Sequence, residues 1–445
     1  MNFPFIEQLF RQLLPLSLLL LGAGLVLTAL LYLLRFRRRG LAAQYAAWQE
    51  EGEQVDETLH DTLHRPQAGE GTAYPRISVV VPTCNQADEL AYLLPRLLKQ
   101  RYEGRLEVIV ADQLSEDNTV QLVQQLQQKN PRLRYTSVPP TSRHIEPRKL
   151  AITLGVKAAH SEWVFVINPD THPDTLTWVQ HFSENLTENV DFVQAYYNYE
   201  DDNSLAVRRA ILERVETFNR RLAAFRGNVV LGAETANFAV RRNWFLERQG
   251  FADSLPLPFG EESIFAARHA EAERTALLLS VHTRLTESTP ENAEFRRRRM
   301  LGMEIRRHFP WRARKFAWLE ALASVLNYAF WLTGLLALAA ALWQTVEQPA
   351  LHALLAGEVA PQEVATPFYL SPALYVLLAC LAEWALYVWL SVRGLRHSLK
   401  AVGERRMGAY ILLFDLTQPF YVAVAQVLRS FHSRSFVRHY LQRSK

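Results

Sequence analysis

The segment ISVVVP, residues 77–82, decides the fold of this chain. It is short, uncharged and rich in valine and isoleucine, and it ends at a proline, which cannot donate to a sheet ladder. A run of this kind is typical of a strand buried on both faces, as in a parallel sheet. We therefore interpret it as the first strand of an α/β domain.

Strand-like and helix-like segments alternate after this strand. Further strands are predicted at residues 106–111, 133–138 and 163–167, and helices at residues 87–100, 116–129 and 148–160. This order predicts βαβ units with a parallel sheet. Because ligands of such sheets bind beyond the carboxyl ends of the strands, the candidate loops are residues 83–88, 112–118 and 168–174. No GxGxxG fingerprint or P-loop follows the first strand, which excludes a dinucleotide or ATPase type of site.

Segments almost free of charge flank this domain on both sides. Residues 13–34, 321–343 and 372–390 each have the length and composition of a transmembrane helix, which needs about 20 apolar residues. A fourth segment, 410–428, contains Asp415 and Pro419. We expect it to form a re-entrant or interfacial helix, with a further span as the alternative.

Basic residues set the predicted orientation of these helices. Arginines cluster at 35–39 and at 296–314, whereas residues 344–367 contain neither Lys nor Arg. The positive-inside rule then places the N-terminus outside and residues 40–317 in the cytoplasm. The sequence thus predicts a multi-pass protein of the inner (plasma) membrane.

The overall charge argues against a nucleic-acid partner. The formal net charge is only +4, and much of the basic excess adjoins the predicted membrane segments, where anionic headgroups attract it. The two cysteines, Cys84 and Cys380, provide neither a disulfide framework nor a metal-binding spacing.

The three candidate loops carry polar motifs in a recognisable order. They read PTCN at residues 82–85, DQLSEDNT at 112–119 and NPDT at 168–171. In this order and at strand ends, they resemble family 2 glycosyltransferases over residues 74–311. The resemblance implies an α/β domain of the GT-A fold (a Rossmann-like nucleotide-diphospho-sugar transferase domain) combined with transmembrane helices, and a nucleotide sugar as donor.

The resemblance assigns the first two loops to the base and ribose of the donor. Thr83, Asn85 and Asp112 occupy the matching positions. The second loop departs from the family's D-D-G-S, because Gln113 and Leu114 replace the second Asp and the Gly. The identity of the base therefore stays open.

The third loop and the helix before it are assigned to the diphosphate. Lys149 matches a lysine of the family, although a solvated helix start explains it equally well. Asp170 and Asn168 stand where the family has the D-x-D motif that binds Mg²⁺ or Mn²⁺, metals that prefer oxygen ligands. Because Asn168 removes one negative charge, we expect the metal to be bound weakly. A helix-capping role is the alternative for Asp170.

Two later motifs are assigned to the acceptor and to catalysis. Asn237, in GAETANFAVRR at residues 232–242, matches a position on the acceptor side, with a buried strand as the alternative. Glu261 and Glu262 match an acidic pair that contains the general base, and position favours Glu262. A neighbouring carboxylate raises proton affinity, which suits a base. An acidic first turn favoured by the helix dipole is compatible with this role.

A run of arginines follows at residues 296–299. Arg296 and Arg299 match the Gln and Arg of the family's Q-x-x-R-W, while Met300 replaces the Trp, and both arginines are assigned to the donor or acceptor. The alternative for most of this region, residues 293–318, is an amphipathic helix on the cytoplasmic leaflet that binds headgroups.

Together these assignments predict an inverting glycosyltransferase with a membrane-associated acceptor: a lipid-linked glycan, a polyprenyl phosphate or a cell-envelope polysaccharide. The alternative is a catalytically weak or inactive GT-A-like membrane protein that acts as a binding or assembly partner in polysaccharide synthesis. The prediction requires Asp112, Asp170 and Glu262 to converge on one cleft at the sheet edge. The predicted domains are an anchor at 1–39, a linker at 40–74, a GT-A domain at 75–292, an interfacial helix at 293–318 and a C-terminal membrane region at 319–445.

Overall fold

The computed structural model describes residues 74–140, 145–316, 372–404, 407–408 and 410–431, together with scattered residues between 26 and 336. The chain divides into two compact units. We call residues 39–316 with 395–445 the α/β unit and residues 1–38 with 317–394 the second unit. The predicted domain limits stay a prediction.

The α/β unit is built on a mixed sheet of seven strands in the order β3-β2-β1-β4-β8-β6-β9. The strands are β1 (Ile77–Thr83), β2 (Leu106–Asp112), β3 (Leu133–Ser137), β4 (Trp163–Val166), β6 (Phe192–Ala195), β8 (Phe238–Arg241) and β9 (Thr275–Leu278). Strands β1 to β4 are parallel, as their predicted alternation with helices requires. Strand β8 runs antiparallel to both β4 and β6, which makes the sheet mixed.

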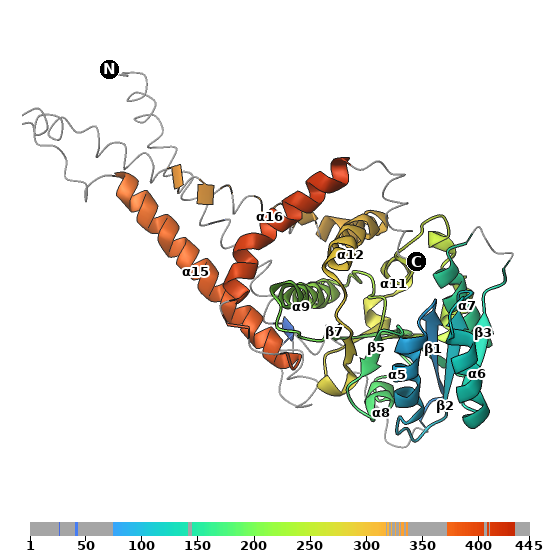
Figure 1. Cartoon of the computed structure of the whole chain (residues 1–445). Coiled ribbons are helices and arrows are strands. Elements are labelled where there is room, and N and C mark those ends of the chain that lie inside the picture. Colours follow the sequence, from blue (N-terminus) through green and yellow to red (C-terminus); the bar gives the residue numbers. More distant parts are fainter. Residues whose placement is uncertain are drawn as a thin grey trace, which may run out of the picture. The chain divides into compact units, whose positions relative to one another are not determined.

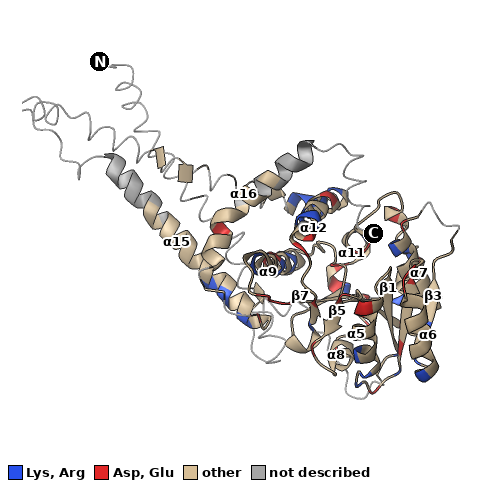
Figure 2. Ribbon diagram, viewed as in Figure 1, with Lys and Arg blue, Asp and Glu red and all other residues tan. Residues whose placement is uncertain are grey.

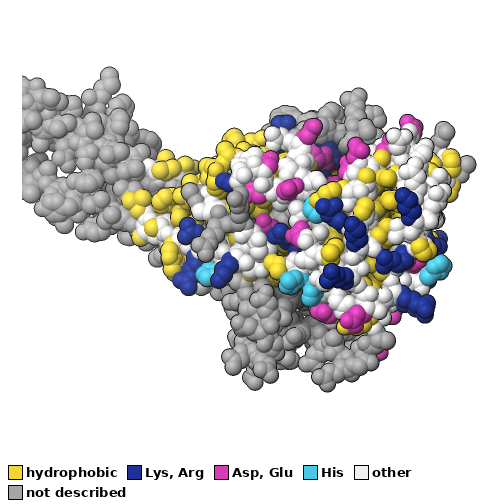
Figure 3. All heavy atoms as spheres, turned by 60° about the horizontal axis from the view of Figure 1, so that its bottom comes forward, with side chains coloured by type: hydrophobic (Ala, Val, Ile, Leu, Met, Phe, Trp, Pro, Cys, Tyr) yellow, Lys and Arg dark blue, Asp and Glu magenta, His cyan; other side chains and the backbone are white. Residues whose placement is uncertain are grey.

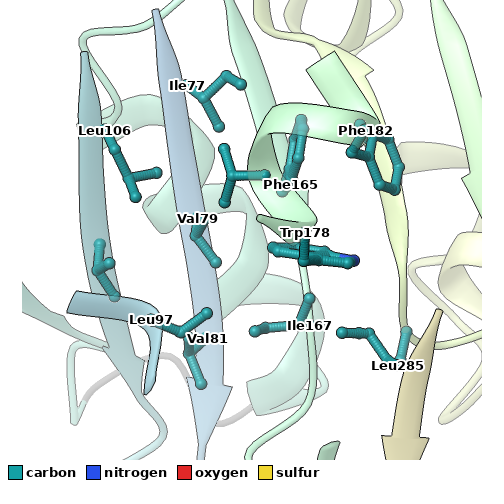
Figure 4. Packing of buried hydrophobic residues seen from close by; sticks show 14 of the residues in the cluster. Ile77, Val79, Val81, Leu97, Leu106, Phe165, Ile167, Trp178, Phe182 and Leu285 are labelled. Atoms are coloured by element: carbon teal, nitrogen blue, oxygen red, sulfur yellow. The ribbon is translucent and has the colours of Figure 1, made fainter. Parts of the chain in front are cut away.

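One face of the sheet is covered by α5 (Ala87–Leu98), α6 (Thr119–Lys129) and α8 (Trp178–Ser183). Alternate residues of β1, Ile77, Val79 and Val81, point into this layer and are fully buried. Figure 4 shows them beside the ring of Trp178. Strands of this kind form because β-branched side chains pack well on a pleated surface.

The opposite face is covered by α7 (Pro147–Ala158), α10 (Arg242–Glu247) and α11 (Glu261–His269). The intervening β1 residue Val80 points into this second layer. Helix α7 lies close to β1, because a Cβ added at Gly155 would meet Cγ1 of Val80 at 2.4 Å. Helix α7 packs on the parallel strands β1, β2 and β3 (Figure 1).

A second sheet of three short strands adjoins the loop after β4. Its order is β5-β10-β7, with β5 at Thr171–Pro173, β10 at Leu285–Glu287 and β7 at Tyr197–Tyr199. The chain leaves β7 for the long helix α9 (Leu205–Arg226) and leaves β10 for α12 (Asn292–Ile305). The small sheet thus brings the starts of α9 and α12 to the third loop.

The C-terminal part of the α/β unit packs on these helices. Helix α16 (Tyr410–Phe431) contacts α9 and α12. Arg209 on α9 donates to the side chains of Thr417 and Gln418 at 2.8 and 2.5 Å and stacks on the ring of Tyr421. The end of α15 (Pro372–Ala401) is tied in as well, through Ser398 and Asn219.

Within the ranges that the structure describes, no helix has both the length and the apolar character needed to cross a membrane. Most residues of the predicted spans at 13–34 and 321–343 lie outside those ranges. The other two apolar segments, 372–390 and 410–428, belong to α15 and α16. In the second unit, the buried ring of Tyr387 packs edge-on against Trp331.

Charged side chains on the surface of the α/β unit are of both signs. In the face shown in Figure 3, basic and acidic groups are interspersed with apolar and polar ones. This mixed surface agrees with the modest formal charge of +4.

Candidate active site

The centre of the candidate site is the guanidinium of Arg148, near the start of α7. Its Nη2 donates to Oε1 of Glu262 at 2.7 Å, to Oδ1 of Asn168 at 2.9 Å and to the carbonyl of Thr235 at 3.1 Å. Its Nε lies 3.1 Å from Oε1 of Glu261. One arginine therefore joins the loop after β4, the segment before β8 and the start of α11, which are far apart in the sequence.

The two glutamates occupy the first turn of α11, where the helix dipole favours negative charge. Gly260 precedes them with a φ of +72°, and a Cβ there would meet Ile305 at 2.6 Å, so both the turn and the space require glycine. Burial and the charge of Glu261 raise the pKa of Glu262 to about 7, although Arg148 opposes this shift. Its Oε2 is buried and has no hydrogen-bond partner among the described residues. Glu262 has the environment of a base that works near neutral pH.

Asp170 lies between two arginines at the edge of the small sheet. Its Oδ2 is 3.7 Å from Nη2 of Arg298, and the charge of Arg148 also acts on its carboxylate. Burial and the charge of Glu287 raise the pKa of Asp170 to about 6 against these two cations. Its Oδ1 is buried and makes no hydrogen bond to any residue that the structure describes.

Glu287 at the end of β10 anchors the basic side of the site. Its carboxylate, 1 % exposed, forms ion pairs with Arg298 on α12 and, at 2.6 Å, with Arg214 on α9. Burial opposes ionisation, but the two guanidiniums outweigh it and lower the pKa of Glu287. Arg214 also lies over the rings of Tyr197 and Tyr199 at 4.0 and 4.1 Å. Figure 2 shows that α12 carries both basic and acidic residues.

The first two loops meet at the carboxyl ends of β1 and β2, as predicted. Thr83 pairs in register with Asp112. The side chain of Asn85, at φ +52°, accepts from the backbone N–H of Glu116 at 2.7 Å, which ties the loops together. Asp112 is buried and accepts from Tyr135 at 3.1 Å. One strand, β1, lies between β2, which Asp112 ends, and β4, which precedes the loop with Asp170.

Two of the predicted ligand-binding residues make structural contacts. Lys149 is 1 % exposed, and its ammonium donates to the backbone carbonyls of Ser254 and Leu257. Asn237 is buried, and its amide donates to the carbonyls of Tyr196 and Thr283 at 2.7 and 2.9 Å. Their roles toward donor and acceptor stay predictions, and the contacts indicate that both brace the loops around the site.

Arginines of α12 form ion pairs with other parts of the α/β unit, whereas the alternative of a headgroup-binding helix expects them to face lipid. Arg299 is paired with Glu213 on α9, and Arg296 is exposed. Of the two arginines between them, Arg298 reaches Asp170 and Glu287. Sequence reasoning therefore found the right helix but not the residue that enters the site. Arg298 lies four residues after Glu294, which accepts from it at 2.9 Å. This i,i+4 spacing is the sequence feature that could have singled out Arg298.

The structure thus brings Glu261, Glu262, Asn168 and Asp170 together around Arg148. Glu262 pairs with Arg148, whose charge also acts on Asp170, whereas Asp112 lies at the end of β2, so the predicted convergence of all three carboxylates on one cleft stays a prediction. The sequence predicts Lys149 as the cation of this helix start, whereas in the structure the adjacent Arg148 enters the site. Arg148 and Lys149 are adjacent at the start of the helix predicted at residues 148–160, so the sequence offers both as candidate cations.

The residues of the third loop do not fit a D-x-D metal site. Asn168, the predicted second ligand, uses its carbonyl oxygen to accept from Arg148. Only Oδ1 of Asp170 is left without a partner among the described residues. No cluster of three or more His, Cys, Asp or Glu side chains suited to a metal ion occurs in the described part of the chain. A hard divalent cation favours several oxygen ligands and is repelled by adjacent guanidiniums.

Comparison with known proteins identifies a family for part of the chain. Residues 78–248 match the model of glycosyl transferase family 2. No curated protein matches the sequence significantly.

Several solved structures are similar at low identity. The mannosyltransferase PcManGT from Pyrobaculum calidifontis, in complex with GDP-Man and Mn²⁺, is 19 % identical over 82 % of this chain and 99 % of that one, with a TM-score of 0.49. TarS 1-349 from S. aureus with UDP-GlcNAc is 18 % identical over 57 % and 73 %, with a TM-score of 0.37. Glucosyl-3-phosphoglycerate synthase from Mycobacterium tuberculosis, with Mn²⁺ and UDP, is 17 % identical over 57 % and 82 %, with a TM-score of 0.34.

The family assignment rests on the family model, which covers the four parallel strands and the loops at their ends. These loops contain the predicted donor residues Thr83, Asn85, Asp112 and Asp170, and α7 of the same region contains Arg148. Residues 78–248 therefore form a glycosyl transferase family 2 domain with a GT-A-like α/β sheet, and the protein is a glycosyltransferase.

Proposed function

We propose that the protein is an inverting glycosyltransferase that moves a sugar from a nucleotide-sugar donor to a membrane-associated acceptor. The observation that supports this best is the position of Glu262. It lies in the first turn of α11, its pKa is raised to about 7, and Arg148 joins it to the loop after β4. In open α/β sheets that loop lies where ligands bind.

In the proposed reaction, Glu262 accepts the proton of the acceptor hydroxyl while the hydroxyl oxygen attacks the anomeric carbon. The bond from that carbon to the diphosphate breaks, and its electron pair leaves with the nucleoside diphosphate. Attack opposite the leaving group inverts the anomeric configuration. Glu261 keeps the pKa of its neighbour high, which makes Glu262 the stronger base of the two.

Access to the base requires a small movement. The side chain of Glu262 is only 1 % exposed, whereas that of its partner Arg148 is 23 % exposed. We propose that the side chain of Glu262 turns outward when Arg148 binds the donor, so that the acceptor hydroxyl can reach its carboxylate. Arginine suits this role because its five donors can be shared between protein and ligand.

The membrane part of the proposal concerns acceptor and location. The charge-poor segments 13–34 and 321–343, with arginines beside them, support anchoring in the inner (plasma) membrane with the α/β unit in the cytoplasm. An anchored enzyme meets a lipid-linked glycan, a polyprenyl phosphate or a growing polysaccharide more readily than a free sugar. On α16, exposed Leu413, Leu416 and Phe420 offer an apolar surface on the α/β unit.

The test is transfer from radiolabelled nucleotide sugars by membranes that contain the protein. We expect one donor to label a membrane-associated product, and the Glu262→Gln variant to lose about 10²-fold or more in kcat while it still binds nucleoside diphosphate. The matched control is Glu291→Gln, an exposed acid just before α12. Unchanged turnover in Glu262→Gln removes this residue from the mechanism.

The same assay decides the alternative of a non-catalytic assembly partner. Gln113 and Asn168 replace family residues, and Arg148 is bound to both glutamates, which favours that alternative if no sugar is transferred. Binding of nucleoside diphosphate without hydrolysis or transfer of any nucleotide sugar would support it.

A further inference from the structure

The donor diphosphate needs positive charge, and the site contains it in side chains. Leaving-group charge in glycosyl transfer is stabilised by fixed cations or donors aimed at the phosphate oxygens. Arg148 and Arg298 lie on either side of the Asn168–Asp170 loop, the first through Asn168 at 2.9 Å and the second through Asp170 at 3.7 Å. They come from different helices, α7 and α12, so that each is positioned independently.

Both arginines are held in place yet remain reachable. Arg148 is fixed by Glu261, Glu262 and the carbonyl of Thr235, and Arg298 by Glu287 and Glu294. Their side chains are 23 % and 32 % exposed, which leaves N–H groups for a ligand. A guanidinium held by carboxylates has already lost much of its rotational freedom, so less entropy is lost when a phosphate binds.

Between these arginines, the Asn168–Asp170 loop offers few free oxygen ligands for a metal ion. Asn168 is engaged by Arg148, and Asp170 provides one carboxylate whose charge Arg298 and Arg148 partly neutralise. A divalent ion at Asp170 would face two guanidiniums, and that repulsion opposes its binding.

We propose that Arg148 and Arg298 bind the diphosphate of the donor in place of a divalent metal, so that donor binding is independent of metal. This inference rests on the proposed function, because it assumes a nucleotide-sugar donor. Arginine forks form paired hydrogen bonds to phosphate oxygens and carry permanent charge. As the bond to the anomeric carbon breaks, the negative charge on the departing nucleoside diphosphate lies against these two cations.

The experiment measures binding of UDP, GDP, ADP, CDP and TDP to the full chain in detergent by isothermal titration calorimetry, with excess EDTA or with Mn²⁺. For the diphosphate that binds, we expect Kd values within about threefold of each other under the two conditions. This arm needs no substitution, so the folding of a variant does not affect it.

The second arm uses arginine variants. Arg148→Met and Arg298→Met should each raise Kd in EDTA about tenfold or more, and Arg148→Lys should give an intermediate loss because it keeps the charge but not the fork. The matched control is Arg134→Met, whose guanidinium pairs with Glu107 at 3.1 Å on β2, away from the loop. Circular dichroism of each variant establishes that it is folded.

The outcomes separate the inference from the proposed function. Binding that requires Mn²⁺, with the arginine variants binding like the unmodified protein in Mn²⁺, overturns the inference and leaves the proposed function intact. Tight binding in EDTA without transfer of any sugar supports the inference while the proposed function fails. Absence of binding for every diphosphate under both conditions overturns both.

Discussion

At the scale of single residues, the raised pKa of Glu262 predicts the pH dependence of transfer. The base is active when ionised, so kcat/KM should fall about tenfold for each pH unit well below a pKa of about 7. Glu261→Gln removes a charge that raises this pKa, and the profile should move to lower pH. The measurement is kcat/KM between pH 5 and 9 for both forms. The assignment of Glu262 as the base is contradicted if the pH profile has its midpoint in the ordinary pKa range of a glutamate. It is also contradicted if Glu261→Gln does not move that midpoint.

The same shift affects stability in the opposite direction. Burial and Glu261 raise the pKa of Glu262 from 4.5 to about 7, so the folded protein binds this proton more tightly than the unfolded chain does. The contribution is therefore fully present below pH 4.5 and is lost as the pH rises through about 7. The ionised base that catalysis uses is the less stable form of the site.

Which residues enter the site could be predicted from the sequence only in part. The acidic pair Glu261–Glu262 was identified because two adjacent acids before an apolar helix form a local pattern. The choice of Lys149 over Arg148, and of Arg296 and Arg299 over Arg298, depends on which way each side chain leaves its helix. That direction is decided by partners more than a hundred residues away, such as Ser254 and Glu262.

At the scale of elements, the ion pairs of Glu287 hold β10, α9 and α12 together. Glu287→Gln leaves Arg214 and Arg298 without their buried partner, and we expect the free energy of unfolding to fall by about 3 kcal/mol. The control, Glu213→Gln, removes a more exposed pair with Arg299 and should cost no more than about 1 kcal/mol. The measurement is urea unfolding of the solubilised protein, followed by tryptophan fluorescence. Equal losses for the two variants would show that Glu287 has no special structural role.

The order of strands and helices from residue 77 to residue 166 agrees with the prediction, with ends that differ by a few residues. Apolar runs and helical periodicity are local, and they alternate clearly in this half of the domain. The antiparallel insertion of β8 between β4 and β6 was not predictable, because β8 is only four residues long and its direction depends on pairing. Strand pairing depends on tertiary contacts, and the sequence of a short strand contains little information about its partner or direction.

At the scale of the whole molecule, the charge-poor segments predict that the protein stays in the membrane fraction after extraction with alkaline carbonate. Deletion of residues 1–39 should leave it there, because the segment 321–343 remains. The measurement is an immunoblot of pellet and supernatant, with a known peripheral protein as the control. Complete release of the full chain would end the proposal of a membrane-anchored enzyme.

The division of the chain into units was beyond what the sequence predicts. The composition separates charged from charge-poor segments and so suggested that everything after residue 319 belongs to a membrane region. In the part of the chain that the structure describes, the end of α15 and the turn after it contact the α/β unit through Ser398 with Asn219 and Glu404 with Arg284, while the predicted domain limits stay a prediction. These contacts are single polar pairs between distant residues, and composition does not encode them.

The packing of α16 on α9 has a consequence for biosynthesis. Arg209 and its partner Gln418 are 209 residues apart, so α9 leaves the ribosome long before the helix that covers it has been translated. Until then the nascent chain presents an unfinished surface, and closing so long a loop slows folding. We expect chains that terminate before residue 410 to be recognised by chaperones and proteases, even though every residue of the candidate active site has already been synthesised.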